Sequence, residues 1–433
     1  MTKPLLFVGD IHLGRTPHRL EHLAKEYDID LPRLSPVEAW RRVVDCAIRR
    51  EVQAVILAGD VVDSENDQFE AFAHLKKGVT DLVKQGIRVL GVAGNHDGIV
   101  LPKLSHFIPN FKLIGEGGHW ERVELEGVDL IGWSFPNKHH SESPLLSDGL
   151  DDARNGRPGV CTIGIIHGDL DASTSKYAPI RRDQLKQLGF DAFFLGHIHK
   201  PDVLKGPRPI GYLGSLIGLG RGEIGPRGPW LVQPKHPSPI VEQLPLGPTH
   251  WLRVSMDLST IDFNNSELFN EVSRRVAEEV KSSDWLQQGG NFLAVGITLE
   301  LTGRVVRDGT PRQQVDDLKN HFHGAYIGDT ANGIPWQIVD IKDRSAPAYD
   351  LNALAQAKTP TGQLARLLLS LEQDGASAIP PSVSHSLEQV LDARWCLDTE
   401  VPLEEHPRPS QVETTHRAAT RLLEQLIDQG GAQ

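Results

Sequence analysis

Residues 5–12 of the chain read LLFVGDIH, a short apolar run followed by a glycine and then by an aspartate and a histidine two positions apart. Side chains at positions i and i+2 of an extended segment point to the same side. Asp10 and His12 are therefore expected to face one point just beyond the carboxyl end of a strand. Open α/β sheets bind their ligands at this edge. The stretch predicts a buried first strand and one side of a site.

Four later apolar runs end in the same way. They finish in Gly59-Asp60, Gly94-Asn95-His96-Asp97, His167-Gly168-Asp169 and Gly196-His197-Ile198-His199. A single Asp-x-His pair is common by chance, and a lone histidine or aspartate is most often an ordinary surface or core residue. Five polar clusters, each directly after an apolar run, indicate one site assembled from five loops.

Composition limits the class of protein. A chain of 433 residues with 39% hydrophobic content is expected to fold as two or three domains. It contains no apolar run of the ~20 residues that span a bilayer, and its beginning lacks the charged-then-apolar pattern of a secretion signal. The three cysteines are widely spaced and read as buried or incidental thiols in a reducing compartment. We therefore expect a cytoplasmic protein without membrane association.

The net charge of −12 argues mildly against a simple nucleic-acid binder, which is normally basic. Local basic patches can override net charge, and a carboxylate-rich site is neutralised by bound cations. Binding to DNA therefore remains compatible with this composition.

Residues 1–247 alternate strand and helix patterns. Ser35, Pro36 and Glu38 predict a helix start with an N-cap and a capping box, and an apolar stripe predicts a second helix over 69–83. Residues 13–34 read as a polar loop and residues 141–158 as a mobile surface loop. The predicted strands lie at residues 5–8, 54–58, 87–93, 129–133, 162–166, 192–195 and 210–213. This order predicts an α/β fold, a two-sheet β-sandwich flanked by helices.

The remainder of the chain divides at a proline-rich connector, residues 234–248. Residues 248–346 read β-α-β-α-β and predict a small α+β capping domain. Residues 347–433 predict a helical C-terminal region, with late helices around 386–392 and 411–427, which either packs on its own protein or docks a partner helix. The glycine-rich stretch 218–228 lacks the helix start of a phosphate-binding loop and reads as turns between antiparallel strands.

Seven side chains from the five clusters are candidate metal ligands: Asp10, His12, Asp60, Asn95, His167, His197 and His199. Oxygen and imidazole ligands without thiolates suit Mn, Fe, Zn or similar divalent ions. Seven ligands are too many for one ion, whereas two ions that share a bridging carboxylate fit well. Paired ions ~3.5–4 Å apart activate water for in-line displacement at phosphorus. Asp60 is the natural bridging group.

These motifs, in this order over residues 10–199, resemble the signature of calcineurin-like metallophosphoesterases. The resemblance implies that one ion is bound by Asp10, His12, Asp60 and His199. It implies that the second is bound by Asp60, Asn95, His167 and His197. His96 would face the scissile phosphate and protonate or stabilise the leaving oxygen, with Asp63 as its orienting group and Asp97 as a second one.

Within this superfamily, residues 11–15 (IHLGR), 195–201 (LGHIHKP) and 211–216 (GYLGSL) are most similar to the SbcD/YhaO DNA-repair exonuclease subunits. That resemblance implies a 3′–5′ DNA exonuclease, with endonuclease activity as a further expectation, in double-strand break repair or end processing. It implies two divalent ions, Mn²⁺ first, with Fe, Zn and Mg as alternatives. The expected partners are DNA, an SbcC-like coiled-coil ATPase gripped by the tail, and a second copy in a homodimer that uses helices including residues 64–84.

Candidate contacts to DNA phosphates are basic or imidazole side chains near these motifs. They are Arg15, Lys138, His139, Lys200, Arg221 and Arg227. Each is equally compatible with a solvated surface charge. Two alternatives for the whole chain also stand: a phosphoesterase acting on small molecules or proteins, which the acidic charge favours, and a non-catalytic scaffold, which would tend to have lost ligands.

Overall fold

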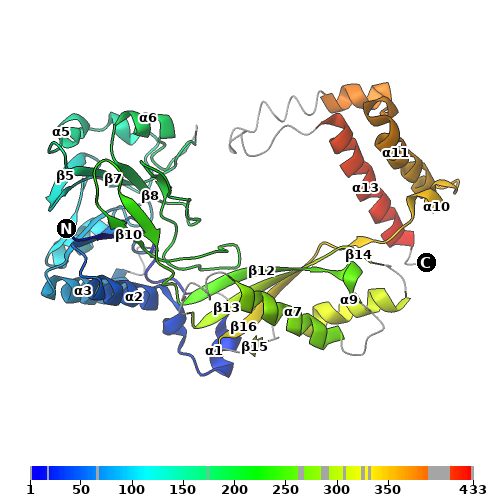
Figure 1. Cartoon of the computed structure of the whole chain (residues 1–433), viewed down its shortest axis with the longest axis horizontal. Helices are drawn as coiled ribbons and strands as arrows, with labels where there is room; N and C mark the ends of the chain where they lie inside the picture. Colours follow the sequence, from blue (N-terminus) through cyan, green and yellow to red (C-terminus); the bar gives the residue numbers. More distant parts are fainter. Residues whose placement is uncertain are drawn as a thin grey trace. The chain divides into compact units, whose positions relative to one another are not determined.

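The computed structural model describes residues 2–16, 19–64, 68–172, 175–261, 268–283, 292–305, 309–322, 327–329, 333–388 and 410–430 (Figure 1). The chain divides into two compact units. The first comprises residues 1–253, 275–298 and 324–339, and the second comprises residues 254–274, 299–323 and 340–433. The predicted domain boundaries after residues 247 and 346 stay predictions.

Among the described residues, six strands form one sheet in the order β11-β10-β1-β2-β3-β4. Its parallel part consists of β1 (Leu5–Val8), β2 (Ala54–Ala58), β3 (Arg88–Val92) and β4 (Phe111–Leu113). β10 (Trp230–Gln233) pairs antiparallel with β1, and β11 (Ile240–Gln243) pairs antiparallel with β10. The parallel strands bring the residues after β1, β2 and β3 to one edge.

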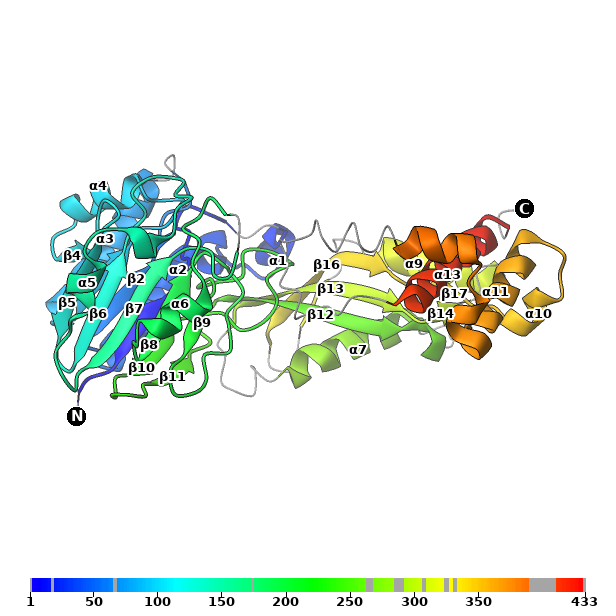
Figure 2. The same ribbon diagram turned by 90° about the horizontal axis from the view of Figure 1, so that it is seen from above.

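A second sheet in the described part has the order β5-β6-β7-β8-β9. It contains β5 (Trp120–Leu125), β6 (Val128–Trp133), β7 (Cys161–His167), β8 (Ala192–Gly196) and β9 (Ile210–Tyr212). Only β5 runs antiparallel to its neighbour in this sheet. Figure 2 shows β6, β7 and β8 side by side.

The two sheets pack face to face, with helices on the outer sides. Leu5 and Phe7 of β1 join a core with residues of β7 and β8, such as Ile165 and Phe194. Leu6 and Val8 point to the other face and contact the helices, as the two-residue period of a strand requires. Figure 1 shows α2 (Pro36–Arg49) and α3 (Gln68–Lys84) on one outer side and α5 (Leu150–Arg154) and α6 (Arg182–Gln187) on the other. The predicted α/β sandwich is confirmed.

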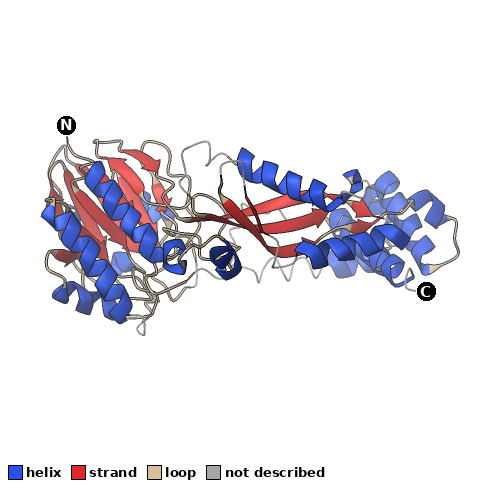
Figure 3. Cartoon of the chain, turned by 90° about the horizontal axis from the view of Figure 1, so that it is seen from below, coloured by secondary structure: helices blue, strands red, loops and turns tan. Residues whose placement is uncertain are grey.

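Helix α2 begins with the predicted Ser35 N-cap, but the predicted capping box with Glu38 does not form. The Ser35 hydroxyl accepts a hydrogen bond from the Val37 amide at 3.2 Å, and Pro36 occupies the first turn. The Glu38 carboxylate forms ion pairs with Arg41 and Arg42, so it stabilises the first turns through charge. Figure 3 shows helices covering the strands in the part of the chain near the N-terminus.

Several predictions for the first unit were wrong in detail. The expected loop at residues 13–34 contains α1 (Glu21–Glu26) and a 3₁₀ turn (Leu31–Leu34). Leu23 and Leu34 are buried in a cluster with Trp251. The many polar residues in 13–34 gave no indication of this burial. The expected surface loop at 141–158 contains a 3₁₀ turn (Pro144–Leu146) and α5. The sequence patterns did not predict α4 (Val100–Phe107), β4, β5, β10 or β11. The predicted connector 234–248 contains β11, which belongs to the first sheet because it pairs with β10.

The glycine-rich stretch 218–228 is not a turn between paired antiparallel strands. It follows β9 of one sheet and precedes β10 of the other. The reason is that β9 and β10 pair with different neighbours, so the stretch crosses between the sheets at the site edge.

Later elements follow the predicted β-α-β-α-β order. A sheet in the order β12-β13-β16-β15 contains β12 (Thr249–Asp257), β13 (Ala294–Thr302), β16 (Pro335–Asp343) and β15 (Ile327–Asp329). The helices are α7 (Leu268–Ser282) and α9 (Gly309–Phe322), with a 3₁₀ turn at Leu258–Thr260. The short strands β14 (Arg304–Val305) and β17 (Ala346–Pro347) pair in parallel.

The C-terminal region is helical, as predicted. It contains α10 (Leu351–Ala355), α11 (Pro360–Asp374), a 3₁₀ turn (Gly375–Ala378), a helical segment at 381–388 and α13 (Gln411–Gly430). α11 and α13 pack through Leu368, Ala419 and Leu423. Of the helix predicted at 386–392, residues 389–392 lie outside the described residues. No helix in the described ranges has the length and apolarity to cross a membrane.

Candidate metal centre

The site lies where strands of both sheets end. Asp10 and His12 follow β1, Asp60 follows β2, and Asn95 follows β3. From the second sheet, His167 is the last residue of β7, and two further histidines, His197 and His199, follow β8. The sequence prediction that five loops converge on one site is therefore matched by the geometry.

Glycines before the ligands permit close approach. A Cβ on Gly94 would lie 2.2 Å from Asp60 Oδ1, and a Cβ on Gly59 would lie 2.6 Å from His167 Nδ1. Three ligand candidates have positive φ angles: His12 at 54°, Asp60 at 47° and His197 at 105°. Such backbone strain costs on the order of 1–3 kcal/mol per residue and is concentrated at functional sites. The local fold is therefore organised to bring these side chains together.

Three residues, Asp10, His12 and His199, form what we name the first ligand group, because their ligand atoms lie within 4.8 Å of one another. His12 Nδ1 donates to Asp63 Oδ1 at 2.8 Å, and His199 Nδ1 donates to Glu223 Oε1 at 2.8 Å. Because an ionised carboxylate can only accept, each ring in its neutral form has its lone pair on Nε2. The two Nε2 atoms lie 3.0 Å apart, so they require a proton or a cation between them.

Asp10 provides an oxygen atom without a hydrogen-bond partner among the described residues beside the Nε2 atoms of His12 and His199. Its side chain is fully buried, and Oδ1 accepts a hydrogen bond from the His197 amide at 2.9 Å. Oδ2 is also buried and has no hydrogen-bond partner in the described part of the chain. An unsatisfied buried carboxylate oxygen is costly unless a ligand completes it. The atom fits a bound divalent cation.

The second ligand group consists of Asp60, His167 and His197. His167 Nδ1 donates to the Ala58 carbonyl at 3.0 Å, which leaves Nε2 facing Asp60 Oδ2 at 3.3 Å. In His197 the roles of the nitrogens are reversed: Nε2 faces Asp169 Oδ1 at 3.2 Å. Its Nδ1 lies 2.9 Å from Asn95 Oδ1. Asn95 Oδ1 is also 3.0 Å from His167 Nε2, so the amide oxygen belongs with this group.

Asp60 lies between the groups. Its Oδ2 is 3.3 Å from His167 Nε2 and 3.9 Å from His12 Nε2. Oδ1 accepts a hydrogen bond from the His96 amide at 2.9 Å, which fixes the carboxylate plane. A single oxygen that faces a histidine of each group has the position that a bridging ligand requires.

The electrostatics of the site favour bound cations. Burial raises the pKa of Asp60, but the neighbouring His167 and His12 lower it well below its usual range. Burial lowers the pKa of His167, but Asp60 and Asp10 raise it to about 9. Without metal, protons on imidazoles neutralise the buried carboxylates, and a divalent ion can replace those protons.

His96 lies beside the ligands, with its ring exposed. Its Nδ1 donates to the backbone carbonyl of Asp63 at 2.7 Å, whereas the Asp63 carboxylate binds His12. Asp63 therefore contacts both histidines, through different atoms. The Asp97 carboxylate instead accepts amides of Gly94 and Val61, so its position does not support a second orienting role toward His96. Burial and Asp60 raise the pKa of Asp97 to about 6.

A pocket of about 620 Å³ opens in front of His96. Its lining residues are Asp63, Ser64, Asn95, His96, Ile99, Lys138, His139 and Tyr177. It combines one metal-ligand candidate, Asn95, with the Lys138 cation and aromatic rings, which suits an anionic substrate.

The predicted phosphate contacts are placed unequally. Lys138 and His139 line the pocket, and Arg15 Nη1 lies 3.7 Å from Asp63 Oδ1. Lys200 and Arg221 are exposed. Arg227 is only 3% exposed, and its guanidinium donates to the carbonyls of His199 and Ile224. We therefore do not retain Arg227 as a DNA contact.

Sequence reasoning missed three residues of the site. Glu223 and Asp169 contact metal-ligand candidates, and Tyr177 lines the pocket. Asp169 stood inside a recognised polar cluster, which was a usable signal. Glu223 lies in the glycine-rich stretch, where nothing local distinguishes it from a surface residue.

Residues 3–201 match the family model described as calcineurin-like phosphoesterase. The uncharacterized metallophosphoesterase YhaO of Bacillus subtilis is 27% identical over 254 residues, covering 54% of this chain and 58% of YhaO. The DNA double-strand break repair protein Mre11 of Sulfolobus acidocaldarius is 27% identical, covering 49% of this chain and 54% of that protein. Mre11 of Aeropyrum pernix is also 27% identical, covering 65% and 71%. The match thus spans little more than half of the first two relatives.

The family model covers every metal-ligand candidate, and two groups of these side chains lie close enough together to hold metal ions. The chain accordingly has a hydrolase fold with a site suited to metal ions. Residues 3–201 are thus similar to calcineurin-like phosphoesterases, and YhaO and Mre11 proteins are among the relatives that the chain resembles.

Proposed function

We propose that the chain is a metal-dependent DNA nuclease, a 3′–5′ exonuclease with endonuclease activity, that processes DNA ends in double-strand break repair. The observation that carries the proposal is the pair of adjacent ligand groups around Asp60, with Asp10 Oδ2 and two bare imidazole nitrogens aimed at one point. The relatives named as double-strand break repair proteins support DNA as the substrate.

The proposed centre holds two divalent ions, Mn²⁺ first, with Fe, Zn or Mg as alternatives. Asp10, His12, Asp60 and His199 would hold one, and Asp60, Asn95, His167 and His197 the other. When bound, such a pair supplies Lewis acidity and lowers the pKa of water, which makes a nucleophile available at neutral pH.

The residues of the chain do the remaining work. The Asp63 carbonyl holds the Nδ1 proton of His96 at 2.7 Å, so the opposite nitrogen is the one available to the pocket. A protonated His96 can then donate to, or stabilise, the leaving oxygen. Lys138 and His139 line the same pocket and can bind phosphate oxygens. Arg15, Lys200 and Arg221 are further candidates for the DNA path.

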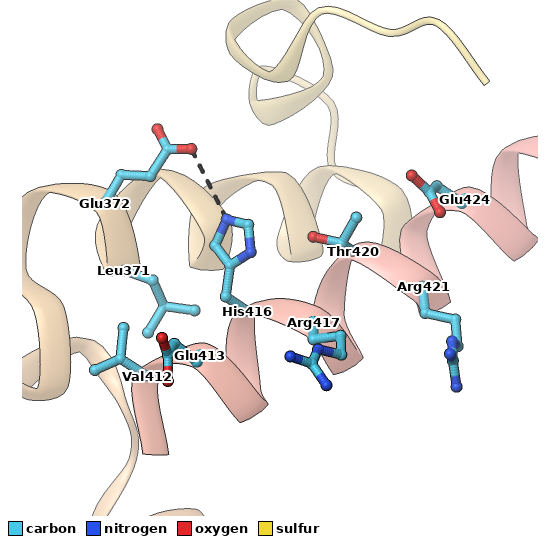
Figure 4. Close-up of a pocket in the computed structure, with 9 residues that line it drawn as sticks. All are labelled: Leu371, Glu372, Val412, Glu413, His416, Arg417, Thr420, Arg421 and Glu424. Atoms are coloured by element: carbon cyan, nitrogen blue, oxygen red, sulfur yellow. Dashed lines mark ion pairs between the residues drawn. The ribbon is translucent and has the colours of Figure 1, made fainter. Parts of the chain in front are cut away.

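The C-terminal region is the proposed contact to an SbcC-like coiled-coil ATPase. Figure 4 shows the groove between α11 and α13, with His416 Nε2 4.0 Å from Glu372 Oε1. The groove has a volume of about 660 Å³ and combines the apolar Leu371 and Val412 with charged side chains. Such a mixed surface suits an amphipathic helix.

A homodimer through the helices of the first unit is also proposed. Phe69 of α3 is 82% exposed, which is unusual for a large aromatic side chain in a monomer. Light scattering of the wild type and of Phe69→Asp tests this: a dimeric wild type and a monomeric variant are expected, and a monomeric wild type contradicts the dimer.

The test of the nuclease proposal is digestion of end-labelled linear duplex DNA with Mn²⁺. Wild type should degrade the DNA, and Asp60→Ala and His96→Ala should not. His106→Ala serves as the matched control, because His106 is a histidine with a 70% exposed side chain outside the site. Nuclease activity that persists in both site variants contradicts the proposal.

A phosphoesterase acting on small molecules or proteins is the second candidate, favoured by the net charge of −12. A substrate panel of bis-nitrophenyl phosphate, nucleotides, a phosphopeptide and DNA separates the two. Turnover of the small substrates without DNA cleavage would support this alternative. No bound metal and no effect of a chelator would support the non-catalytic scaffold.

A further inference from the structure

We infer that Glu223 is a positioning residue that fixes His199 as a metal ligand, so that the glycine-rich stretch 218–228 supports the metal centre. Glu223 Oε1 accepts from His199 Nδ1 at 2.8 Å. The two residues are 24 positions apart, and Glu223 follows the strands that carry the ligands. The inference rests on the proposed dinuclear centre and deepens it.

The Glu223 carboxylate is itself fixed. Its Oε2 accepts from the Leu219 amide at 3.0 Å and from the Ser215 hydroxyl at 3.3 Å. The Glu223 amide donates to the Gly220 carbonyl at 2.9 Å, which closes a tight turn. Oε2 and the backbone of Glu223 are therefore held by neighbouring residues, and the Oε1 acceptor presented to His199 has a defined direction.

Ser215, just before the glycine-rich stretch, and Arg227 within it hold the backbone of His199. The His199 carbonyl accepts from the Ser215 amide at 2.9 Å and from the Arg227 guanidinium. Arg227 is almost completely buried. Ring and backbone of His199 are thus held from one side, which leaves the Nε2 lone pair directed at His12 and Asp10.

A carboxylate behind a ligating imidazole has two effects. It fixes the tautomer in which the opposite nitrogen is bare, and its charge raises the basicity of that nitrogen. His12 has the same arrangement with Asp63 at 2.8 Å. The first ligand group therefore has two imidazoles, each hydrogen-bonded to a carboxylate. Of these two carboxylates, Glu223 is the one that lies outside residues 3–201, the range that the family model matches.

The experiment measures Mn²⁺ binding by calorimetry and by metal analysis after equilibrium dialysis, without DNA. Wild type should bind two ions. In Glu223→Gln, which keeps an acceptor oxygen but removes the charge, one of the two ions should bind about 10-fold more weakly. In Glu223→Ala the loss should approach ~100-fold, the upper range for such partners. The other ion should be unchanged in both variants.

Glu242→Gln is the matched control, because Glu242 is exposed on β11 in the same unit. A second measurement separates positioning from loop stability: the thermal midpoint of the metal-free protein and its rise on adding Mn²⁺. Positioning predicts similar metal-free midpoints and a smaller Mn²⁺-induced rise in the Glu223 variants. A lower metal-free midpoint with an unchanged Mn²⁺-induced rise would mean that Glu223 only braces the loop, and would overturn the inference.

Two further outcomes are distinguishable. If wild type binds two ions and both Glu223 variants bind them equally well, only this inference is wrong. If wild type binds no Mn²⁺ at all, the proposed dinuclear centre fails and the inference fails with it.

Discussion

The two ligand groups share Asp60 as a neighbour but are supported in different ways. In the first group, His12 and His199 are backed by the carboxylates of Asp63 and Glu223, whose side chains are 25% and 22% exposed. In the second group, His167 is fully buried and donates to the main-chain carbonyl of Ala58, the last residue of β2. One group is supported by side chains on loops, and the other by the sheet itself.

This difference has a consequence for metal binding. A carboxylate partner adds charge to the imidazole and can be lost by one substitution, whereas a carbonyl of a buried strand cannot be removed without breaking the sheet. We therefore expect that single substitutions can change the metal affinity of the first group, which we call the adjustable group. The second group should be less sensitive, because the backbone of the sheet supports it. His197, which faces Asp169, is the exception within the second group.

The largest effect is expected from Asp60→Asn, because this substitution affects both groups at once. Removing the shared charge should weaken both ions and lower DNA cleavage by ~10³-fold or more, since paired metals supply several kcal/mol of transition-state stabilisation. Metal analysis and cleavage rates check this. Asp151→Asn is the control, because Asp151 is an exposed residue of α5. Retention of one tightly bound ion would show that Asp60 is not shared.

The next effect separates the groups. Asp63→Asn should weaken one ion by about 10–100-fold, the usual cost of losing such a partner, and Asp169→Asn should weaken the other ion to a similar or smaller extent. Two-site Mn²⁺ titrations of the single variants and of the double variant check the assignment. Independent ions predict that the double variant shows both losses. If both substitutions weaken the same ion, the division into two groups is wrong.

The supports of the site were harder to predict than the ligands. Asp10 and His12 could be predicted as ligands because an apolar run, a glycine and alternating polar residues are local sequence signals. Glu223 carries no such signal, because its role depends on His199, 24 residues earlier. Arg227 was predicted to contact DNA phosphates because it is basic and lies among glycines, but tertiary contacts bury it.

The same limit applies to the fold. The sandwich followed from strand and helix order, since central strands such as β1 (LLFV) and β2 (AVILA) are continuous apolar runs. β5 was missed because its sequence, WERVEL, mixes charged and apolar residues without a regular two-residue alternation or a continuous apolar run, and it lies at the edge of its sheet. α1 was missed because its buried face depends on Leu23 packing near Trp251, which is distant in the sequence.

A smaller effect is expected on stability. Mn²⁺ at 100 times its dissociation constant should add about 2.7 kcal/mol per independent site to the free energy of unfolding, and a chelator should reverse the gain. In Asp63→Asn the Mn²⁺-induced increase in the free energy of unfolding should be smaller, because only the ion of the first group binds more weakly. Thermal unfolding at fixed Mn²⁺ with and without chelator measures this. A gain that disappears completely in Asp63→Asn would mean that the two ions bind only together.

The smallest expected effect concerns which part of the site DNA would contact in the proposed nuclease, the first ligand group or the pocket beside His96. Arg15 stands beside the support of the first group, 3.7 Å from Asp63, whereas Lys138 lines the pocket with Asn95 and His96. Each phosphate contact contributes about −0.9 to the slope of log binding constant against log salt. Arg15→Gln and Lys138→Gln should therefore each make that slope shallower by about 1 if the residue contacts a phosphate. Lys205→Gln, an exposed lysine, is the control.

Fluorescence anisotropy with duplex DNA at several salt concentrations measures the slopes, with Ca²⁺ in place of Mn²⁺ to suppress cleavage. A change for Lys138 alone would place the DNA over the pocket and leave the adjustable group to one side. A change for both would place the backbone across the two groups, so that the carboxylate-supported half lies directly under the substrate. Unchanged slopes for both variants would remove these residues from the DNA path and leave Lys200 and Arg221, which adjoin His199 and the Glu223 segment, as the remaining candidates.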